Sequence, residues 1–236
     1  MPDHYPQTIE GVKAFLLDVI AATQDFCIAY KPNISFFEAL GIEGLRVLES
    51  VRKAIPESIP MILDGKRGDI GNTSAKQAKY LFDVFGADAS TLHPYMGADS
   101  LVPFFEYKDK FHFVLGLTSN SGAKDFEFAL TDGVPLYSKI IQRCDQWLVE
   151  YGNVGVVVGG TQSELKTIRV ANPKLLFLIP GVGAQGGDYQ DCALTGRNAD
   201  GLALINVGRS LIYASKAPDF LDKVRLLAQT NYGLVR

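Results

Sequence analysis

Residues 64–73 read Asp64-Gly-Lys66-Arg-Gly-Asp69-Ile70-Gly-Asn-Thr73 and directly follow the short apolar run Pro60–Leu63. The apolar run predicts a buried strand. Because successive side chains of a strand point to opposite faces, we expect Asp64 and Lys66 on the same side. Asp69 follows a turn, and the sequence leaves open whether it reaches back or toward another subunit. A charged surface turn is the plain alternative, but the position at a strand's carboxyl end favours a functional site.

Apolar runs and helix-period patterns alternate along the rest of the chain. This alternation predicts parallel strands joined by crossover helices, as in a (βα) barrel or an open doubly wound sheet. The expected strands are 26–30, 60–63, 87–92, 111–117, 154–158, 175–179 and 201–207, and the expected helices are 8–23, 35–51, 73–85, 98–107, 134–151, 162–171 and 210–228.

The strand count exposes a gap at the start of the chain. Seven strands are predicted, but the chain opens on a helix with no strand before it. An eight-stranded barrel would therefore lack its first strand, and the gap would leave an unpaired ladder.

Composition limits the classes of function. With 236 residues, 47% of them hydrophobic, and no compositional break, the chain suits one large α/β domain or two small ones. A net charge of −3 argues against nonspecific binding to nucleic acid or to an anionic membrane. Three widely spaced cysteines predict reduced thiols. The first residues, Met-Pro-Asp-His-Tyr-Pro, lack the basic-then-apolar pattern of a signal peptide, and no apolar run approaches the length needed to span a bilayer, so we expect a soluble cytoplasmic protein.

Polar groups follow several predicted strands. The segment Pro180-Gly-Val-Gly-Ala-Gln185-Gly-Gly-Asp188 follows strand 175–179, and Asn206-Val-Gly208-Arg209 ends the last strand. Glycines let backbone N–H groups approach an anion, and an arginine can grip a phosphate with two hydrogen bonds, so both loops predict phosphate binding. Ordinary tight turns are the alternative. The segment Thr118-Ser119-Asn120-Ser-Gly122 could read a polar ring edge or cap a helix.

These segments together resemble the orotidine 5′-phosphate decarboxylase family, and in particular its bacterial type, whose signature reads Asp-x-Lys-Arg-Gly-Asp-Ile-Gly-x-Thr. Residues 64–73 match that signature throughout. Further matching blocks are Ala29-Tyr-Lys31-Pro-Asn-Ile-Ser-Phe-Phe-Glu38, Pro94-Tyr-Met-Gly-Ala-Asp-Ser-Leu101, Thr118-Ser-Asn, Pro180-Gly-Val-Gly-Ala-Gln-Gly-Gly and Val207-Gly-Arg-Ser210.

The resemblance implies a TIM (β/α)8 barrel with parallel strands, a single domain over residues 1–236, and a homodimer with shared active sites. It implies conversion of orotidine 5′-phosphate to UMP and CO₂ in de novo pyrimidine biosynthesis, without cofactor or metal. The expected partner molecules are this nucleotide and a second copy of the chain, with no nucleic acid and no membrane.

The resemblance also assigns roles to residues. Lys66 would protonate C6, Asp64 would lie near the departing carboxylate, and Lys31 would orient Asp64 and the ribose hydroxyls. Asp69 completes this charged tetrad and, with Ile70 and Thr73, would enter the partner's site. The remaining substrate contacts implied are Ser119 at the pyrimidine edge and Gln185 and Arg209 at the phosphate.

One feature departs from the family pattern. The family normally begins with a strand ending in Leu-Asp-Pro, whose Asp contacts the ribose, and Asp3 does not match it in context. The same strand is missing from the count above. We therefore expect that the start is an internal Met, that the natural protein is longer, and that this chain is less active or less stable than a complete homologue.

Two other functions stay open. Enzymes resembling 3-hexulose-6-phosphate synthase or 3-keto-gulonate-6-phosphate decarboxylase share Asp-x-Lys-x-x-Asp but use Mg²⁺, with a carboxylate where Lys31 stands. Alternatively, loss of the first strand could leave a catalytically impaired nucleotide-binding protein, which would bind UMP without turnover.

Overall fold

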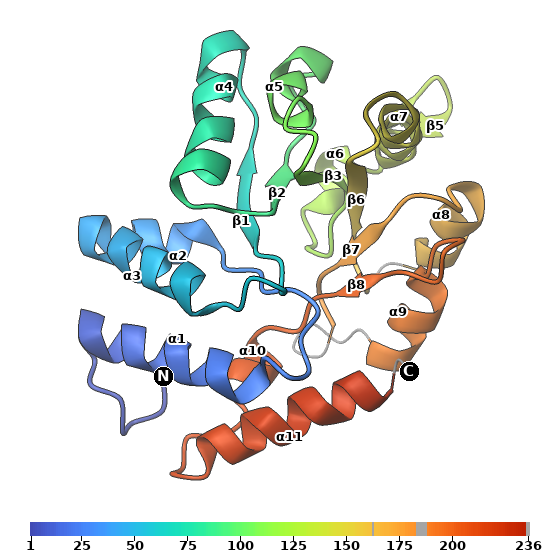
Figure 1. Ribbon diagram of the computed structural model, residues 1–236. Helices are drawn as coiled ribbons and strands as arrows, with labels where there is room; N and C mark the ends of the chain where they lie inside the picture. Colours follow the sequence, from blue (N-terminus) through green and yellow to red (C-terminus); the bar gives the residue numbers. More distant parts are fainter. Residues whose placement is uncertain (162, 183–187, 235–236) are drawn as a thin grey trace.

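A curled sheet of six parallel strands forms the centre of the protein. The computed structural model describes residues 1–161, 163–182 and 188–234. The strands run in the order β1 (Ile62–Arg67), β2 (Ala89–Leu92), β3 (Phe111–Leu117), β6 (Val154–Val158), β7 (Phe177–Ile179) and β8 (Leu204–Ile205), and every neighbouring pair is parallel. Figure 1 shows the strands in the middle, with helices around the outside. The predicted α/β class with a parallel sheet is confirmed.

Helices connect the strands in the predicted alternation. They are α1 (Ile9–Thr23), α2 (Ile34–Glu38), α3 (Gly41–Ala54), α4 (Gly71–Lys79) continued by the π-helical turn η1 (Tyr80–Val84), the 3₁₀ turn η2 (Ala98–Ser100), α5 (Val102–Phe105), α6 (Ala123–Phe126), α7 (Leu136–Tyr151), α8 (Leu165–Ala171), α9 (Tyr189–Gly196), α10 (Arg209–Ile212) and α11 (Phe220–Gly233). A small antiparallel hairpin of β4 (Leu130–Thr131) and β5 (Val134–Pro135) precedes α7.

Two helices predicted as continuous are each divided in two. The predicted helix 35–51 breaks at Gly41, whose φ of 70° lies in the left-handed region that glycine tolerates best. The predicted helix 210–228 breaks between α10 and α11, where Pro218 stands. Proline lacks the N–H that a helix interior needs, so α11 begins after it.

The predicted strand 26–30 does not form a continuous ladder. Two isolated parallel bridges lie in this part of the chain, one from Tyr30 to Met61, which precedes β1, and one from Asn33 to Asp64 of β1. Pro32 lies between them and has no N–H to donate, although its carbonyl accepts the N–H of Asp64 at 2.9 Å. The segment therefore lies beside β1, which places Lys31 at the carboxyl end of the sheet.

The strands are buried on both faces, which explains their continuous apolar runs. Side chains facing the helices belong to the main core, which includes Leu63, Val114 and Ile179. Side chains facing the inside of the curled sheet form a second cluster of Ile62, Ala89, Phe113, Val157 and Leu178. The period of two along each strand then puts the next inward residues just above this layer, at the carboxyl end.

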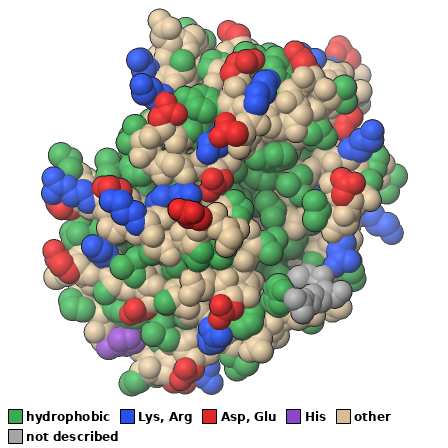
Figure 2. Space-filling model, viewed as in Figure 1, with side chains coloured by type: hydrophobic (Ala, Val, Ile, Leu, Met, Phe, Trp, Pro, Cys, Tyr) green, Lys and Arg blue, Asp and Glu red, His purple; other side chains and the backbone are tan. Residues whose placement is uncertain are grey.

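The outer helices close the structure around the sheet. Helices α1 and α11, far apart in the sequence, pack side by side through a cluster of Tyr5, Phe15, Val19, Phe220 and Val224. Figure 2 shows basic and acidic side chains interspersed over the visible face, with hydrophobic ones between them. Among the described helices, none is both long and apolar enough to cross a membrane.

One buried arginine ties together the elements that flank the loop after β7. Arg169 of α8 donates hydrogen bonds to the carbonyls of Asn172 and Leu175 at 2.7 and 2.9 Å, and to that of Gly196 in α9 at 2.7 Å. Its guanidinium stacks 3.4 Å from the ring centre of Phe177 in β7. These contacts join α8 to β7 and to the last residue of α9, the two elements between which the predicted phosphate loop lies.

Candidate active site

A cavity of about 350 Å³ opens at the carboxyl ends of the strands. This is the end at which parallel α/β barrels place their functional groups. The cavity is lined by Lys31, Asp64, Lys66, Thr91, Leu115, Thr118, Ser119, Asn120, Val157, Leu178, Pro180, Gly181, Val182, Asn206, Gly208 and Arg209. Three of the four residues of the predicted charged tetrad therefore share one space with Arg209.

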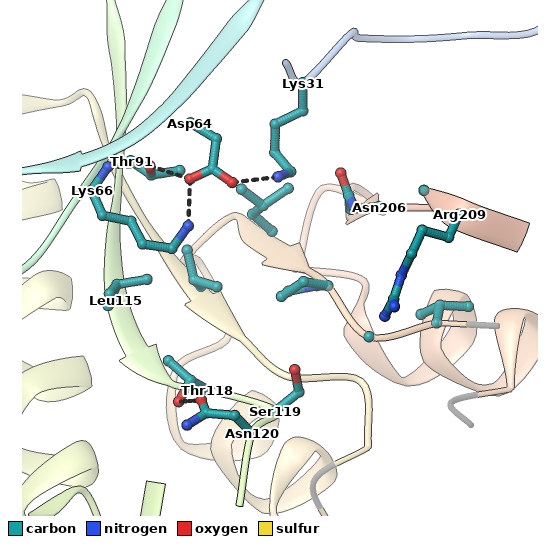
Figure 3. Close-up of a pocket in the computed structure, with 16 residues that line it drawn as sticks. Lys31, Asp64, Lys66, Thr91, Leu115, Thr118, Ser119, Asn120, Asn206 and Arg209 are labelled. Atoms are coloured by element: carbon teal, nitrogen blue, oxygen red, sulfur yellow. Dashed lines mark hydrogen bonds and ion pairs between the residues drawn. The ribbon is translucent and has the colours of Figure 1, made fainter. Parts of the chain in front are cut away.

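Asp64 is the centre of the charged group. One carboxylate oxygen, Oδ2, accepts a hydrogen bond from Lys31 Nζ at 2.7 Å. The other, Oδ1, accepts hydrogen bonds from Lys66 Nζ at 2.6 Å and from Thr91 Oγ1 at 2.8 Å. Figure 3 shows Asp64 pointing between the two lysines. The prediction that Asp64 and Lys66 face one space is confirmed by this contact.

The two ammonium groups keep Asp64 ionised. Burial, which leaves Asp64 5% exposed, raises the pKa of its carboxyl group, but the charges and hydrogen bonds of Lys31 and Lys66 together outweigh it. The pKa of Asp64 falls to about 2 as a result. The site thus holds one ionised carboxylate between the amines of two lysines.

The strand reaches this geometry through an irregularity that period-two reasoning does not foresee. In the β1–β2 pairing, Leu63 is opposite Ser90 and Arg67 is opposite Leu92, so the three residues 64–66 lie opposite Thr91 alone. Within this bulge, Lys66 has a φ of 45°, a left-handed conformation that costs an L-residue on the order of 1 kcal/mol or more. Such strain is common at functional sites.

The predicted phosphate contacts lie across the cavity from the charged group. Arg209 begins α10, and Figure 3 shows its guanidinium directed into the space below Asn206, with Lys31, Asp64 and Lys66 on the opposite side. Pro180 and Gly181 of the loop after β7 also line the cavity. Gln185, the other predicted phosphate contact, lies outside the described residues.

Ser119 forms a third side of the cavity, in the loop after β3. The preceding residue, Thr118, donates its backbone N–H to Glu127 Oε2 and its hydroxyl to Glu127 Oε1, both at 2.7 Å. A Cβ at Gly159, after β6, would lie 2.9 Å from the backbone N and Cα of Ser119, so only glycine allows this close approach. The hydrogen bonds join this loop to the end of α6, and the close approach places Ser119 beside the residue that follows β6.

The other three predicted site residues are not part of this cavity lining. Asp69 accepts a hydrogen bond from the backbone N–H of Ile70 at 2.7 Å. Ile70 is 58% exposed, and Thr73 also lies at the surface. The structure therefore does not bring Asp69, Ile70 and Thr73 together with Lys66 within one chain.

Thr91 and Asn33 are site residues that the sequence reasoning did not single out. Thr91 ends the inward row of β2, and Asn33 Nδ2 lies 3.5 Å from Asp64 Oδ2. The sequence could have indicated Thr91, because it is a polar residue next to the carboxyl end of the predicted strand 87–92. Asn33 could not be found this way, because only the bridge to Asp64 places it at the sheet.

The described residues offer ammonium groups rather than a set of metal ligands. Among them, no group of three or more His, Cys, Asp or Glu side chains is arranged to hold a metal ion. Lys31 Nζ lies 2.7 Å from Asp64, and this positive charge opposes a divalent cation at that carboxylate. The arrangement can stabilise negative charge that develops beside Lys66 and can bind an anion at Arg209.

Comparison with known proteins agrees with this geometry. The model of the Orotidine 5'-phosphate decarboxylase / HUMPS family matches residues 9–220. An orotidine 5'-phosphate decarboxylase from Herpetosiphon aurantiacus is 44% identical over 231 residues, which cover 97% of this chain and 85% of that protein.

Solved structures show the same fold. The OMP decarboxylase of Leishmania donovani is 38% identical with a TM-score of 0.86, over 97% of this chain and 89% of that one. The UMP synthase of Leishmania donovani is 40% identical with a TM-score of 0.90, over 97% of this chain, which spans only 50% of that longer protein. These likenesses identify the curled parallel sheet as that of a TIM barrel, as predicted. With the family model matching most of its length, the chain belongs to the orotidine 5′-phosphate decarboxylase / HUMPS family.

Proposed function

We propose that the protein is a cytoplasmic orotidine 5′-phosphate decarboxylase, which forms UMP and CO₂ in pyrimidine biosynthesis. The observation that supports this most is the Lys66 ammonium, held 2.6 Å from a buried carboxylate in the same cavity as Arg209. The relatives that cover nearly the whole chain have the same activity in their names.

The reaction needs a cation beside C6 of the pyrimidine. When the bond from C6 to the carboxylate breaks, CO₂ departs and the electron pair stays on C6. An ammonium group fixed next to that carbon stabilises the developing negative charge and then donates a proton to form the new C–H bond. Lys66 is suited to this role because its Nζ forms an ion pair with Asp64 at 2.6 Å while its side chain, which lines the cavity, remains 46% exposed.

Asp64 and Lys31 place the proton donor. Asp64 contacts both lysines through different oxygens, so the carboxylate cannot turn without breaking one of the two ion pairs. Lys31 is only 16% exposed and occupies the side of Asp64 away from Lys66, from which it can reach the ribose hydroxyls. Asp64 then lies beside the carboxylate that leaves the substrate.

The rest of the cavity binds the parts of the substrate that do not react. Arg209 and Gln185 bind the phosphate, and Ser119 contacts the pyrimidine edge. The apolar side chains of Leu115, Val157 and Leu178 also line the cavity. Binding energy from a phosphate far from C6 can be used to position the ring, which raises turnover.

A direct assay distinguishes this function from the Mg²⁺-dependent alternative. We expect the wild-type chain to convert orotidine 5′-phosphate to UMP, followed by ultraviolet absorbance, at the same rate in EDTA and in added Mg²⁺. The reason is that Lys31 supplies a positive charge at Asp64, where the alternative enzymes use a metal. No turnover, or turnover that requires the metal, contradicts the proposal. UMP binding without turnover would instead support an impaired nucleotide-binding protein.

We also propose a homodimer in which Asp69, Ile70 and Thr73 complete the active site of the partner. The support is their position outside the cavity of their own chain and the 58% exposure of the apolar Ile70. In a two-fold symmetric dimer the same surface meets itself, so each chain supplies these residues to the other.

Mixing two inactive variants tests the shared site. We expect Lys66→Ala and Asp69→Ala to be inactive separately and to regain up to about one quarter of wild-type activity after subunit exchange, since half the dimers then hold one complete site. Sedimentation measures dimer content in each sample. If Asp69 acts within its own chain, the mixed dimer has no complete site and no activity returns.

A further inference from the structure

Thr91 of β2 is buried beneath the charged group, with 2% of its surface exposed. A hydroxyl has one hydrogen to donate and two lone pairs to accept. The hydroxyl of Thr91 donates to Asp64 Oδ1 at 2.8 Å and accepts the backbone N–H of Lys66 at 3.0 Å. It therefore joins the carboxylate to the main chain of the proposed proton donor.

The Lys66 backbone needs such a partner because of the bulge in β1. Residues 64–66 lie opposite Thr91 alone, so the regular β1–β2 ladder does not supply a carbonyl for the Lys66 N–H. A side-chain hydroxyl takes the place of that carbonyl. The φ of 45° at Lys66 is costly, and persists only when surrounding contacts hold it.

Thr91 and Lys66 also meet at the same carboxylate oxygen. Lys66 Nζ contacts Asp64 Oδ1 at 2.6 Å, and this is the atom to which Thr91 donates, while Lys31 binds Oδ2. Figure 3 shows Thr91 next to Asp64, on the side of Lys66. The hydroxyl thus closes a loop of contacts that runs from Lys66 N through Thr91 and Asp64 to Lys66 Nζ.

We propose that Thr91 is a positioning residue for decarboxylation, whose hydroxyl sets the backbone of Lys66 and the orientation of Asp64 so that the ammonium lies where C6 is protonated. This inference rests on the proposed function. Packing alone does not explain a threonine here, because valine has nearly the same shape and avoids the burial of a hydroxyl.

The test compares Thr91→Val, which removes the hydroxyl and keeps the shape, with Thr91→Ser, which keeps the hydroxyl. We expect Thr91→Val to lower kcat by about 10- to 100-fold, the value of a hydrogen bond to a charged group, with KM and UMP affinity changed less than about threefold. Thr91→Ser should stay within about threefold of wild-type kcat. If thermal unfolding shows that Thr91→Val does not fold, Thr91→Ala removes the same hydroxyl without adding bulk.

A crystal structure of Thr91→Val gives a readout that does not depend on turnover. We expect Lys66 to leave its left-handed φ and its Nζ to separate from Asp64 beyond ion-pair distance. An unchanged Lys66 backbone and ion pair, or equal kcat for the Val and Ser variants, overturns the role of Thr91. A wild-type enzyme that does not decarboxylate the substrate overturns the proposed function instead, so the two failures are distinguishable.

Discussion

Replacing Lys66 by alanine is expected to lower kcat for orotidine 5′-phosphate by about 10⁴-fold or more, because one change removes both the proton donor and the stabilising charge. Proton donation and electrostatic stabilisation each contribute at least about 10²-fold in enzymes where they have been separated. The measurement is the absorbance assay at saturating substrate. Activity within tenfold of wild type would contradict the assignment of Lys66.

Lys66→Arg is the matched control for this change. Arginine keeps a positive charge but holds its proton far more tightly, since its pKa exceeds 12, and its planar fork does not fit the position of an ammonium. We expect this variant to retain UMP binding and to be nearly as inactive as Lys66→Ala. Folding is expected to change little in either variant, because the Lys66 side chain is 46% exposed. Circular dichroism and thermal unfolding check this.

Replacing Arg209 by alanine is expected to raise KM for orotidine 5′-phosphate by about 10- to 1000-fold, because a charged, two-point contact with the phosphate is lost. Arg209 is exposed at the start of α10, so the melting temperature should change little. Steady-state kinetics and UMP titration measure the effect. Unchanged substrate affinity would show that Arg209 does not bind the phosphate.

Orotidine, the substrate without its phosphate, isolates the cause of that effect. We expect Arg209→Ala and wild type to have similar kcat/KM for orotidine, since this substrate has no phosphate for Arg209 to bind. Arg209→Lys should recover part of the affinity for the phosphorylated substrate, because lysine restores the charge but not the two-point geometry. A large decrease in kcat/KM for orotidine itself would indicate that Arg209→Ala disturbs the cavity rather than only the phosphate contact.

The parallel sheet could be predicted from local patterns, but the ends of several elements could not. Alternating apolar runs and helix periods located all six strands, because burial on both faces requires a continuous apolar run. In place of a strand at 26–30 the structure has two isolated bridges, one at Tyr30 and one beyond the predicted range at Asn33, because Pro32 between them interrupts the ladder. Two predicted helices are divided, one at Gly41 and one near Pro218. The apolar periodicity continues on both sides of each break, so the periodicity alone does not reveal the break.

The sequence by itself determined the order of strands and helices, the gathering of Lys31, Asp64, Lys66 and Arg209 at one end of the sheet, and the family. Parallel strands all end on the same side, so a residue's place after a strand is enough to bring it to this site. Only the tertiary structure decided that β1 bulges opposite Thr91, that Lys66 takes a left-handed backbone, and that Asp69 stays outside its own cavity. Those features depend on contacts between segments that are distant in the sequence, and local periodicity does not predict such contacts.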